Sequence, residues 1–258
     1  MSESRDDAAT ETSGGRWPAP DTGGATSGEE QPPARLTSGG GGLGFLIPAA
    51  GGLILAASVL ATNFLPFPLV EMDDPVHPTP SEWERFFAIA GGAQLRLTLV
   101  NSVGIVFQFA FLVVLARVVA PAGGVRAFVL VAAGALGSLL ALASLAVFTA
   151  PVVMTVSGSD MQALDDLSQF ADAVSLVLAG VEVALAGLAI LAGRSLPRWL
   201  GWASLPLGVL LAGLSGSQLL AGEVLFPDGR NLAFAGFLIW NVAASVCLLV
   251  HGPARSPR

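Results

Sequence analysis

Six long runs of apolar residues follow one another along the chain, and each is about as long as a membrane is thick. An α-helix rises about 1.5 Å per residue, so about 20 residues cross the roughly 30 Å of hydrocarbon in a bilayer. Within lipid, backbone N–H and C=O groups must find partners inside the protein, so we predict that these runs are helices. The predicted spans cover residues 43–66, 94–118, 125–149, 168–193, 200–222 and 232–250.

The composition agrees with this pattern. Of the 258 residues, 53% are hydrophobic and only 12% are charged, which is far from the average of soluble domains. We therefore predict an all-α fold, with one polytopic six-helix transmembrane bundle over residues 43–250 and a cytoplasmic tail over residues 251–258. All 12 basic residues are arginine, a bias that we interpret as the mark of a GC-rich bacterial genome.

The first 42 residues differ from the rest of the chain. Residues 1–42 are rich in Gly, Ser, Thr, Pro and acidic residues and contain almost no aliphatic clusters. Such a segment cannot bury enough apolar surface to offset the entropy lost on ordering, so we predict a disordered cytoplasmic leader. It is also too long and too acidic for the charged start of a signal peptide.

The distribution of arginines predicts the orientation. With a cytoplasmic N-terminus, nine arginines fall on the inner side, and only Arg85, Arg96 and Arg230 fall on the outer side. This asymmetry follows the positive-inside rule. We therefore expect a multi-pass protein of the plasma membrane with both termini in the cytoplasm.

The first outer loop carries the signals of a short helix. Thr79 can cap a helix that starts at Pro80, and Glu82 completes a capping box. We predict a short outer amphipathic helix that either lies on the membrane surface or packs over the bundle. Its apolar face would consist of residues at helical spacing, namely Trp83, Phe86, Phe87 and Ala90.

The residues at the connection between the fourth and fifth runs are typical of the membrane–water interface. The fifth run carries a stripe of small residues that is typical of helix packing. The basic and aromatic residues expected as interface anchors are Arg194, Arg198, Trp199 and Trp202. Small residues at four-residue spacing let helices approach closely, either within the chain or in a dimer. The stripe consists of Ser204, Gly208, Ala212 and Gly216.

One carboxylate, Glu182, lies deep within the fourth apolar run. An ionised carboxylate at the bilayer centre costs about 2.5–3.5 kcal/mol on insertion scales, so it is normally paired or protonated. We expect Glu182 to be protonated, with its hydroxyl donated to Gln108, Asn241 or a backbone carbonyl. Its helical face would consist of polar and small residues turned toward the bundle interior: Asp165, Ser168, Asp172, Ser175, Ala179, Glu182, Ala186, Ala189 and Gly193.

Polar residues at similar depth on other runs complete a candidate site. Two interpretations stay open for it. Interhelical hydrogen bonds worth about 0.6–2 kcal/mol each would make it structural, whereas a titratable acid in a membrane also marks proton or solute pathways. The predicted intramembrane cluster comprises Glu182, Gln108, Asn241, Asn101, Ser175 and Asp172.

Motifs of catalysis are missing from the sequence. Cys247 is the single cysteine, and both histidines lie outside the apolar runs. No phosphate-binding loop, zinc-protease motif or cysteine pair occurs. We therefore expect no enzymatic activity, no metal, no cofactor and no nucleic-acid partner. Apart from the lipid bilayer, a protein partner or a homo-oligomer stays open.

Two functions fit these expectations. The first is a non-enzymatic interaction or regulatory protein of the membrane. The alternative is a small-solute or proton-linked transporter centred on Glu182. Discontinuous helices at the midplane would favour transport, and the sequence places no proline near the centre of a run.

The turn between the fourth and fifth runs carries a resemblance. Residues 196–201 read Leu-Pro-Arg-Trp-Leu-Gly. With the layout of residues 43–250, this element resembles a family of uncharacterised bacterial six-helix integral membrane proteins that have such a turn between spans four and five. The resemblance implies a six-helix fold and supplies no established activity or catalytic residues.

Overall fold

The computed structural model describes six stretches of the chain: residues 43–71, 78–120, 124–154, 156–193, 195–221 and 227–251. The predicted leader at 1–42 and nearly all of the predicted tail at 251–258 lie outside the described residues. The regular elements of the described part are all α-helices, which confirms the predicted all-α class. They are α1 (Leu43–Ala49), α2 (Gly51–Phe64), α3 (Pro80–Val119), α4 (Val125–Val153), α5 (Gly158–Gly193), α6 (Arg198–Ala221) and α7 (Pro227–His251).

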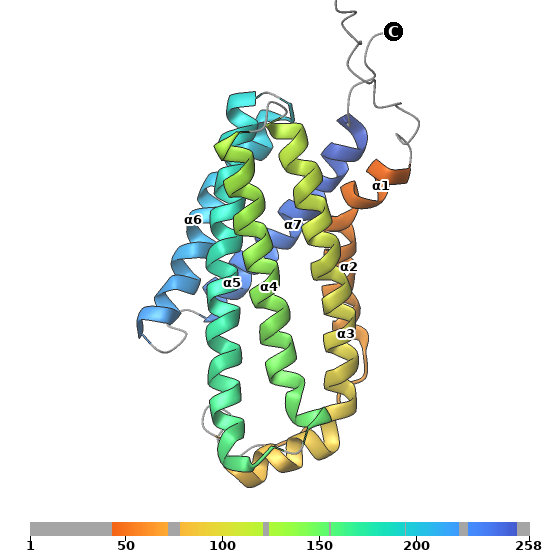
Figure 1. Ribbon diagram of the computed structural model, residues 1–258, viewed down its shortest axis with the longest axis vertical. Coiled ribbons are helices and arrows are strands. Elements are labelled where there is room, and N and C mark those ends of the chain that lie inside the picture. The colour runs from red at the N-terminus through yellow and green to blue at the C-terminus, as the bar shows by residue number, and fades with distance from the viewer. Residues whose placement is uncertain are drawn as a thin grey trace, which may run out of the picture. The chain divides into compact units, whose positions relative to one another are not determined.

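Five of these helices, α3 to α7, are long and apolar enough to cross a membrane. The pair α1 and α2 adds a sixth span if the two count as one. Residues 43 and 251 lie at the same end of the bundle as the C-terminal ends of α3 and α5 (Figure 1). This alternation is what the predicted order of six spans requires.

The first span is bent close to its N-terminal end. The helices α1 and α2 meet at Ala50 with an angle of 45° between them. Pro48 lies within α1, where it lacks the N–H of a regular helical hydrogen bond. Beyond the bend, Gly52 presses against α7: a Cβ at Gly52 would lie 2.6 Å from the backbone oxygen of Asn241.

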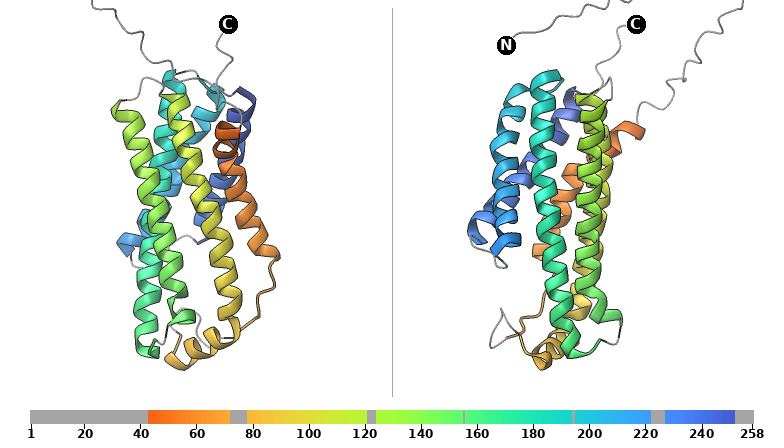
Figure 2. Two further views of the ribbon diagram at one scale, coloured as in Figure 1. Left: turned by 45° about the vertical axis from the view of Figure 1, so that its right-hand side comes forward. Right: turned by 60° about the vertical axis from the view of Figure 1, so that its left-hand side comes forward.

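The predicted amphipathic helix is the first part of α3 rather than a separate element. The predicted capping box is present, since the Thr79 N–H donates to Glu82 Oε2 at 2.7 Å and the Glu82 N–H donates to Thr79 Oγ1 at 3.4 Å. Trp83 is buried, and its ring meets Phe148 of α4 edge-on at 6.3 Å. The first turns of α3 thus lie across the ends of α4 and α5 (Figures 1 and 2). Packing over the bundle is the arrangement that the structure shows.

The helix α5 is the centre of the bundle. It packs along α4, α6 and α3 and has 36 residues, or about 54 Å of length. It begins ten residues before the predicted span, and its first turns extend beyond the C-terminal end of α6, which ends at Ala221 (Figure 1).

The small-residue stripe of α6 faces α5. A Cβ at Gly208 would lie 2.5 Å from the carbonyl oxygen of Gly180, and a Cβ at Gly187 would lie 2.6 Å from Ser204 Cβ. A Cβ at Gly180 would meet the backbone N of Ala212 at 2.6 Å, whereas Gly216 lies in ordinary contact distance of Val177. These contacts place the stripe within the chain, where it allows two helix backbones to touch.

The predicted interface anchors lie at the start of α6. Trp199 and Trp202 are 58% and 65% exposed, and Arg198 beside them is also exposed. Arg194 lies outside the described residues. Exposed tryptophan next to arginine at the end of an apolar helix is typical of a headgroup interface.

Candidate intramembrane cavity

The polar face of α5 turns toward the bundle interior. Ser168, Ser175 and Glu182 are all buried, and Glu182 is only 3% exposed. Large apolar residues of the same helix, such as Phe170 and Leu188, point outward and are more than half exposed. The three-and-four spacing therefore places the polar side chains against neighbouring helices, as helical geometry requires.

Beside this face lies a cavity of about 250 Å³ between α2, α3, α4, α5 and α7. Since a water molecule occupies about 30 Å³ in the liquid, the volume corresponds to about eight waters or a solute of a few heavy atoms. Its wall is largely apolar, with a smaller number of polar groups, which is the usual make-up of a small-molecule site. The polar side chains in the wall belong to Asn101, Gln108, Ser138, Ser144, Asp172, Ser175 and Glu182.

Glu182 lies deep in this cavity and has one side-chain partner. The Nε2 group of Gln108 donates to Glu182 Oε1 at 3.4 Å, near the upper limit for a hydrogen bond. On the other side, a Cβ at Gly134 of α4 would lie 3.1 Å from Glu182 Oε2. The glycine thus leaves room for the carboxylate, which would otherwise press against α4.

Two oxygen atoms in the cavity wall lack hydrogen-bond partners among the described residues. They are Oε1 of Gln108 and Oδ1 of Asn101, both buried. Buried polar atoms are nearly always hydrogen-bonded, to water or a ligand where the protein supplies no partner. A water molecule or another hydrogen-bond donor in the cavity would satisfy both atoms.

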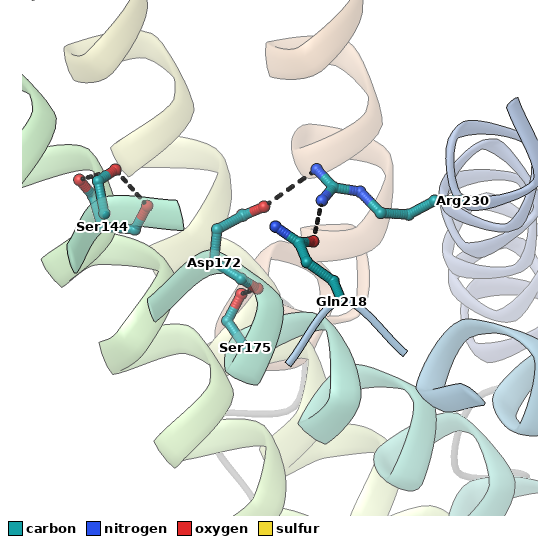
Figure 3. A network of polar contacts seen from close by, with 6 residues as sticks. Ser144, Asp172, Ser175, Gln218 and Arg230 are labelled. Atoms are coloured by element: carbon teal, nitrogen blue, oxygen red, sulfur yellow. Dashed lines mark hydrogen bonds and ion pairs between the residues drawn. The ribbon is translucent and has the colours of Figure 1, made fainter. Parts of the chain in front are cut away.

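A charged pair lies at the other end of the cavity, where α5 meets α7. Arg230 of α7 lies 3.4 Å from Asp172 of α5 and also donates to Oε1 of Gln218 on α6 (Figure 3). A second cavity of about 280 Å³ adjoins this point and shares Ser144 and Asp172 with the first. The pair therefore lies at the junction between the two cavities.

A pair of serines lies beside the same junction. The hydroxyl groups of Ser144 on α4 and Ser168 on α5 are 3.1 Å apart, and Ser168 also bonds the carbonyl oxygen of Ser144. These bonds tie α4 to α5 at this level. Widening the passage between the cavities would strain them.

The structure brings five of the six predicted cluster residues into one cavity wall. Asn241 is the exception: it is fully buried, its Nδ2 group donates to the carbonyl oxygen of Phe237, and it lies beside Gly52 of α2. The helix α7 crosses the bundle at an angle (Figure 1), and its Phe234 and Phe237, not Asn241, line the cavity. The five residues that share the cavity are Glu182, Gln108, Asn101, Ser175 and Asp172.

The reasoning from sequence did not single out Arg230 and Gln218 as part of this site. Arg230 stands out in the sequence as one of three arginines on the predicted outer side. Its position near the start of α7 gives no sign of a partner, because Asp172 lies 58 residues away. Only the packing of α5, α6 and α7 brings the three side chains together.

The cavity offers oxygen acceptors and a single basic residue at its edge. Asp172 precedes Glu182 by ten residues, or about 15 Å along the helix, so the two carboxylates do not share one ligand. Among the described residues, no group of three His, Cys, Asp or Glu side chains is arranged to hold a metal ion. This chemistry suits a hydrogen-bond donor or a monovalent cation.

The fold and the cavity define the class of this protein. It is a multi-pass helical membrane protein with a cavity between its spans, largely apolar and lined by a few polar side chains. No protein-family model, no curated protein and no solved structure matches the chain. The role of the cavity therefore has to be derived from its own geometry.

Proposed function

We propose that this protein is a proton-linked transporter of a small solute, with the Glu182 cavity as its binding site. The observation that carries the proposal is the cavity of about 250 Å³ beside a buried carboxylate. A side chain that only joined two helices would need a close partner and no space. Here the Gln108 donor lies 3.4 Å from Glu182 Oε1, and a cavity of about 250 Å³ adjoins the carboxylate.

Glu182 can change its charge at a bounded cost. Ionising an acid at this depth costs about 2.5–3.5 kcal/mol on insertion scales, whereas the neutral acid avoids this cost. The bond to Gln108, with 3.4 Å between the heavy atoms, is a long one. A carboxyl group that is neutral at rest and has one long hydrogen bond is suited to releasing and taking up a proton.

A second cavity and the bent first span lie next to the site. The second cavity continues from Asp172 and Ser144 toward the ends of α6 and α7, which lie outside if the arginine-rich side is cytoplasmic. Leu55 and Val59 of α2 form part of the wall, and α2 belongs to the bent first span. Discontinuous spans next to the binding site are common in transporters, where they allow one part of the bundle to move.

The proposal includes no catalytic step. Hydroxyl groups in the wall belong to Ser138, Ser144 and Ser175, and none of these residues has a histidine among the other lining residues. A serine nucleophile needs such a base. We therefore assign the polar groups to binding and proton transfer.

Proton flux in liposomes tests this function. The full chain is reconstituted with a pH-sensitive dye inside, and concentration gradients of ethylammonium, tetramethylammonium and sodium chloride are imposed in turn. We expect wild-type liposomes to change internal pH several-fold faster than protein-free liposomes, and Glu182→Gln to remove the difference. Ser215→Ala is the matched control, because Ser215 is fully buried and without a hydrogen-bond partner but lies outside the cavity. Equal flux in wild type and Glu182→Gln, or no flux in wild type, would exclude the proposal.

A further inference from the structure

We infer that the solute is a small organic cation with an ammonium head group, an inference that rests on the proposed function. The first argument is the hydrogen-bonding pattern of the cavity. Gln108 is 5% exposed and lines the cavity, as does Asn101, and the Oε1 atom of the first and the Oδ1 atom of the second are buried without a hydrogen-bond partner among the described residues. With the Glu182 carboxylate, these atoms are all acceptors. An ammonium group is the complementary species, because it has three donors and no acceptor.

The second argument is charge. Arg230 faces Asp172, so the charge of that carboxylate is met within the protein. Glu182 faces no basic residue: α2, α3, α4 and α7 contribute no charged side chain to the wall, and α5 contributes only Asp172 and Glu182. An ionised Glu182 therefore leaves one negative charge uncompensated. A monovalent cation balances it, whereas an anion would be repelled and a neutral solute would leave it unpaired.

The third argument is the apolar part of the wall, which distinguishes an organic cation from a metal ion. Phe234 and Phe237 of α7 both line the cavity, with ring centroids 6.1 Å apart and planes at 27°. Aromatic faces attract ammonium groups and cover alkyl chains at the same time. A divalent metal ion instead requires about six to eight oxygen ligands, far more than one carboxylate and two amides provide.

The volume sets the size of the solute. About 250 Å³ admits an ammonium group with a short alkyl chain and leaves no room for a drug-sized molecule. Ethylammonium and tetramethylammonium fall within this range, and the first of them keeps the N–H donors that the oxygens require.

Binding of such a cation provides a way to couple it to protons. Before binding, Glu182 carries a proton as the neutral acid, as its depth in the membrane requires. When the ammonium arrives, the O–H bond of the acid breaks, the proton leaves through the cavity, and the carboxylate keeps the electron pair and binds the cation. One positive charge enters and one leaves, so the cavity stays neutral throughout. This balance gives an exchange of one ammonium for one proton.

Calorimetry on the full-length protein in detergent tests the inference. The probes are ethylammonium chloride, tetramethylammonium chloride, sodium chloride at equal ionic strength, and 1-propanol as a neutral molecule of similar shape. We expect ethylammonium to bind at one site and to release up to one proton, seen as a dependence of the heat on the ionisation enthalpy of the buffer. We expect sodium and 1-propanol to bind at least 10-fold more weakly.

Two variants separate charge from space, and a third serves as control. Glu182→Gln keeps the shape and removes the charge, and Ala141→Leu fills the cavity and keeps the charge. Each should weaken ethylammonium binding at least 10-fold. Ser215→Ala should leave it unchanged, because that side chain does not line the cavity.

The outcomes distinguish this inference from the function on which it rests. If ethylammonium does not bind while proton flux still depends on Glu182, the solute class is wrong and the transport proposal stands. Equal binding to Glu182→Gln, or sodium binding as tight as ethylammonium, also overturns the solute class. Glu182-dependent binding without any proton flux confirms the cation site and overturns proton-linked transport.

Discussion

The two sides of α5 pack against their neighbouring helices in opposite ways, one in close contact and the other beside a cavity. Toward α6, Gly180 and Gly187 meet Gly208 and Ser204 so closely that a Cβ on the glycines would collide with backbone or Cβ atoms. Toward α3 and α4, the face around Glu182 also carries small side chains, yet a cavity of about 250 Å³ remains. Small residues on one helix therefore do not determine whether a gap closes.

The difference lies in what the partner helices present. Toward α6, small residues from both helices interlock, and the buried Ser204 hydroxyl donates to the carbonyl oxygen of Leu200 on its own helix. On the cavity side, five helices converge, and the carboxylate and amide groups of Glu182, Gln108 and Asn101 need hydrogen-bond partners that apolar packing cannot supply. The first face stabilises the bundle, and the second keeps a space for ligand or water.

The largest expected effect comes from breaking the α5–α6 contact. Gly208→Leu places a side chain where even a Cβ would lie 2.5 Å from the Gly180 carbonyl oxygen, so we expect a loss of about 3 kcal/mol or more in stability. Thermal unfolding in detergent would measure it. Gly213→Leu on the same helix is the control, because nothing lies within 4 Å of a Cβ there. Equal melting temperatures for both variants would show that the close contact contributes little.

The second prediction tests whether Glu182 lowers the stability of the folded protein. Replacing the acid by an apolar side chain of similar length removes a buried polar group, so Glu182→Leu should gain about 1–2 kcal/mol of stability while it abolishes ethylammonium binding. Glu182→Gln should change stability by less than about 1 kcal/mol, because the amide still bonds Gln108. A large loss of stability in Glu182→Leu but not in Glu182→Gln would instead identify Glu182 as a structural hydrogen-bonding residue.

A third change fills the cavity without touching its polar groups. Ala141→Leu adds apolar volume to the wall and should raise stability by about 1 kcal/mol, since cavity filling usually has this effect. Its exposed neighbour Ala143 provides the control: Ala143→Leu should leave both stability and binding near wild type. Unchanged binding in Ala141→Leu would place the ligand site elsewhere.

The smallest expected effect on stability concerns the charged pair at the junction of the two cavities. The Arg230 and Asp172 side chains are 24% and 40% exposed, so Arg230→Gln should cost less than about 1 kcal/mol. If the pair controls entry, the same variant should change the rate of cation uptake into liposomes by several-fold, whereas the equilibrium affinity changes less. Arg85→Gln, at an exposed residue lining neither cavity, is the control. Identical uptake rates in both variants would exclude a role in entry.

Much of the site could be derived from periodicity. The spacing of Asp172, Ser175 and Glu182 places them on one helical face, and the depth of Gln108 along its own helix matches that of Glu182, as the bond between them shows. The position of Asn241 could not be derived in this way. Depth along a helix says nothing about the direction in which the helix crosses the bundle, and α7 crosses at an angle (Figure 1).

Some features of the helices could likewise be predicted from the sequence, and others could not. The capping box of Thr79 and Glu82 correctly predicts where α3 begins, because capping is local chemistry. The continuity of α3 from Pro80 to Val119 and the bend at Ala50 were not predicted. The first accompanies a contact with a distant residue, Phe148 against Trp83, and the second follows Pro48, which was not considered in predicting the first span.

The sequence by itself determined that this chain forms apolar membrane helices, that one of them carries a polar face with a buried acid, and where one helix is capped. These properties follow from hydropathy, helical period and local hydrogen bonds, which act over a few residues. The tertiary structure alone decided that the polar face borders a cavity, that Arg230 meets Asp172 there, and that the small-residue stripe of α6 packs on α5. Those outcomes depend on the angles and distances between helices, which are set by side chains far apart in the sequence.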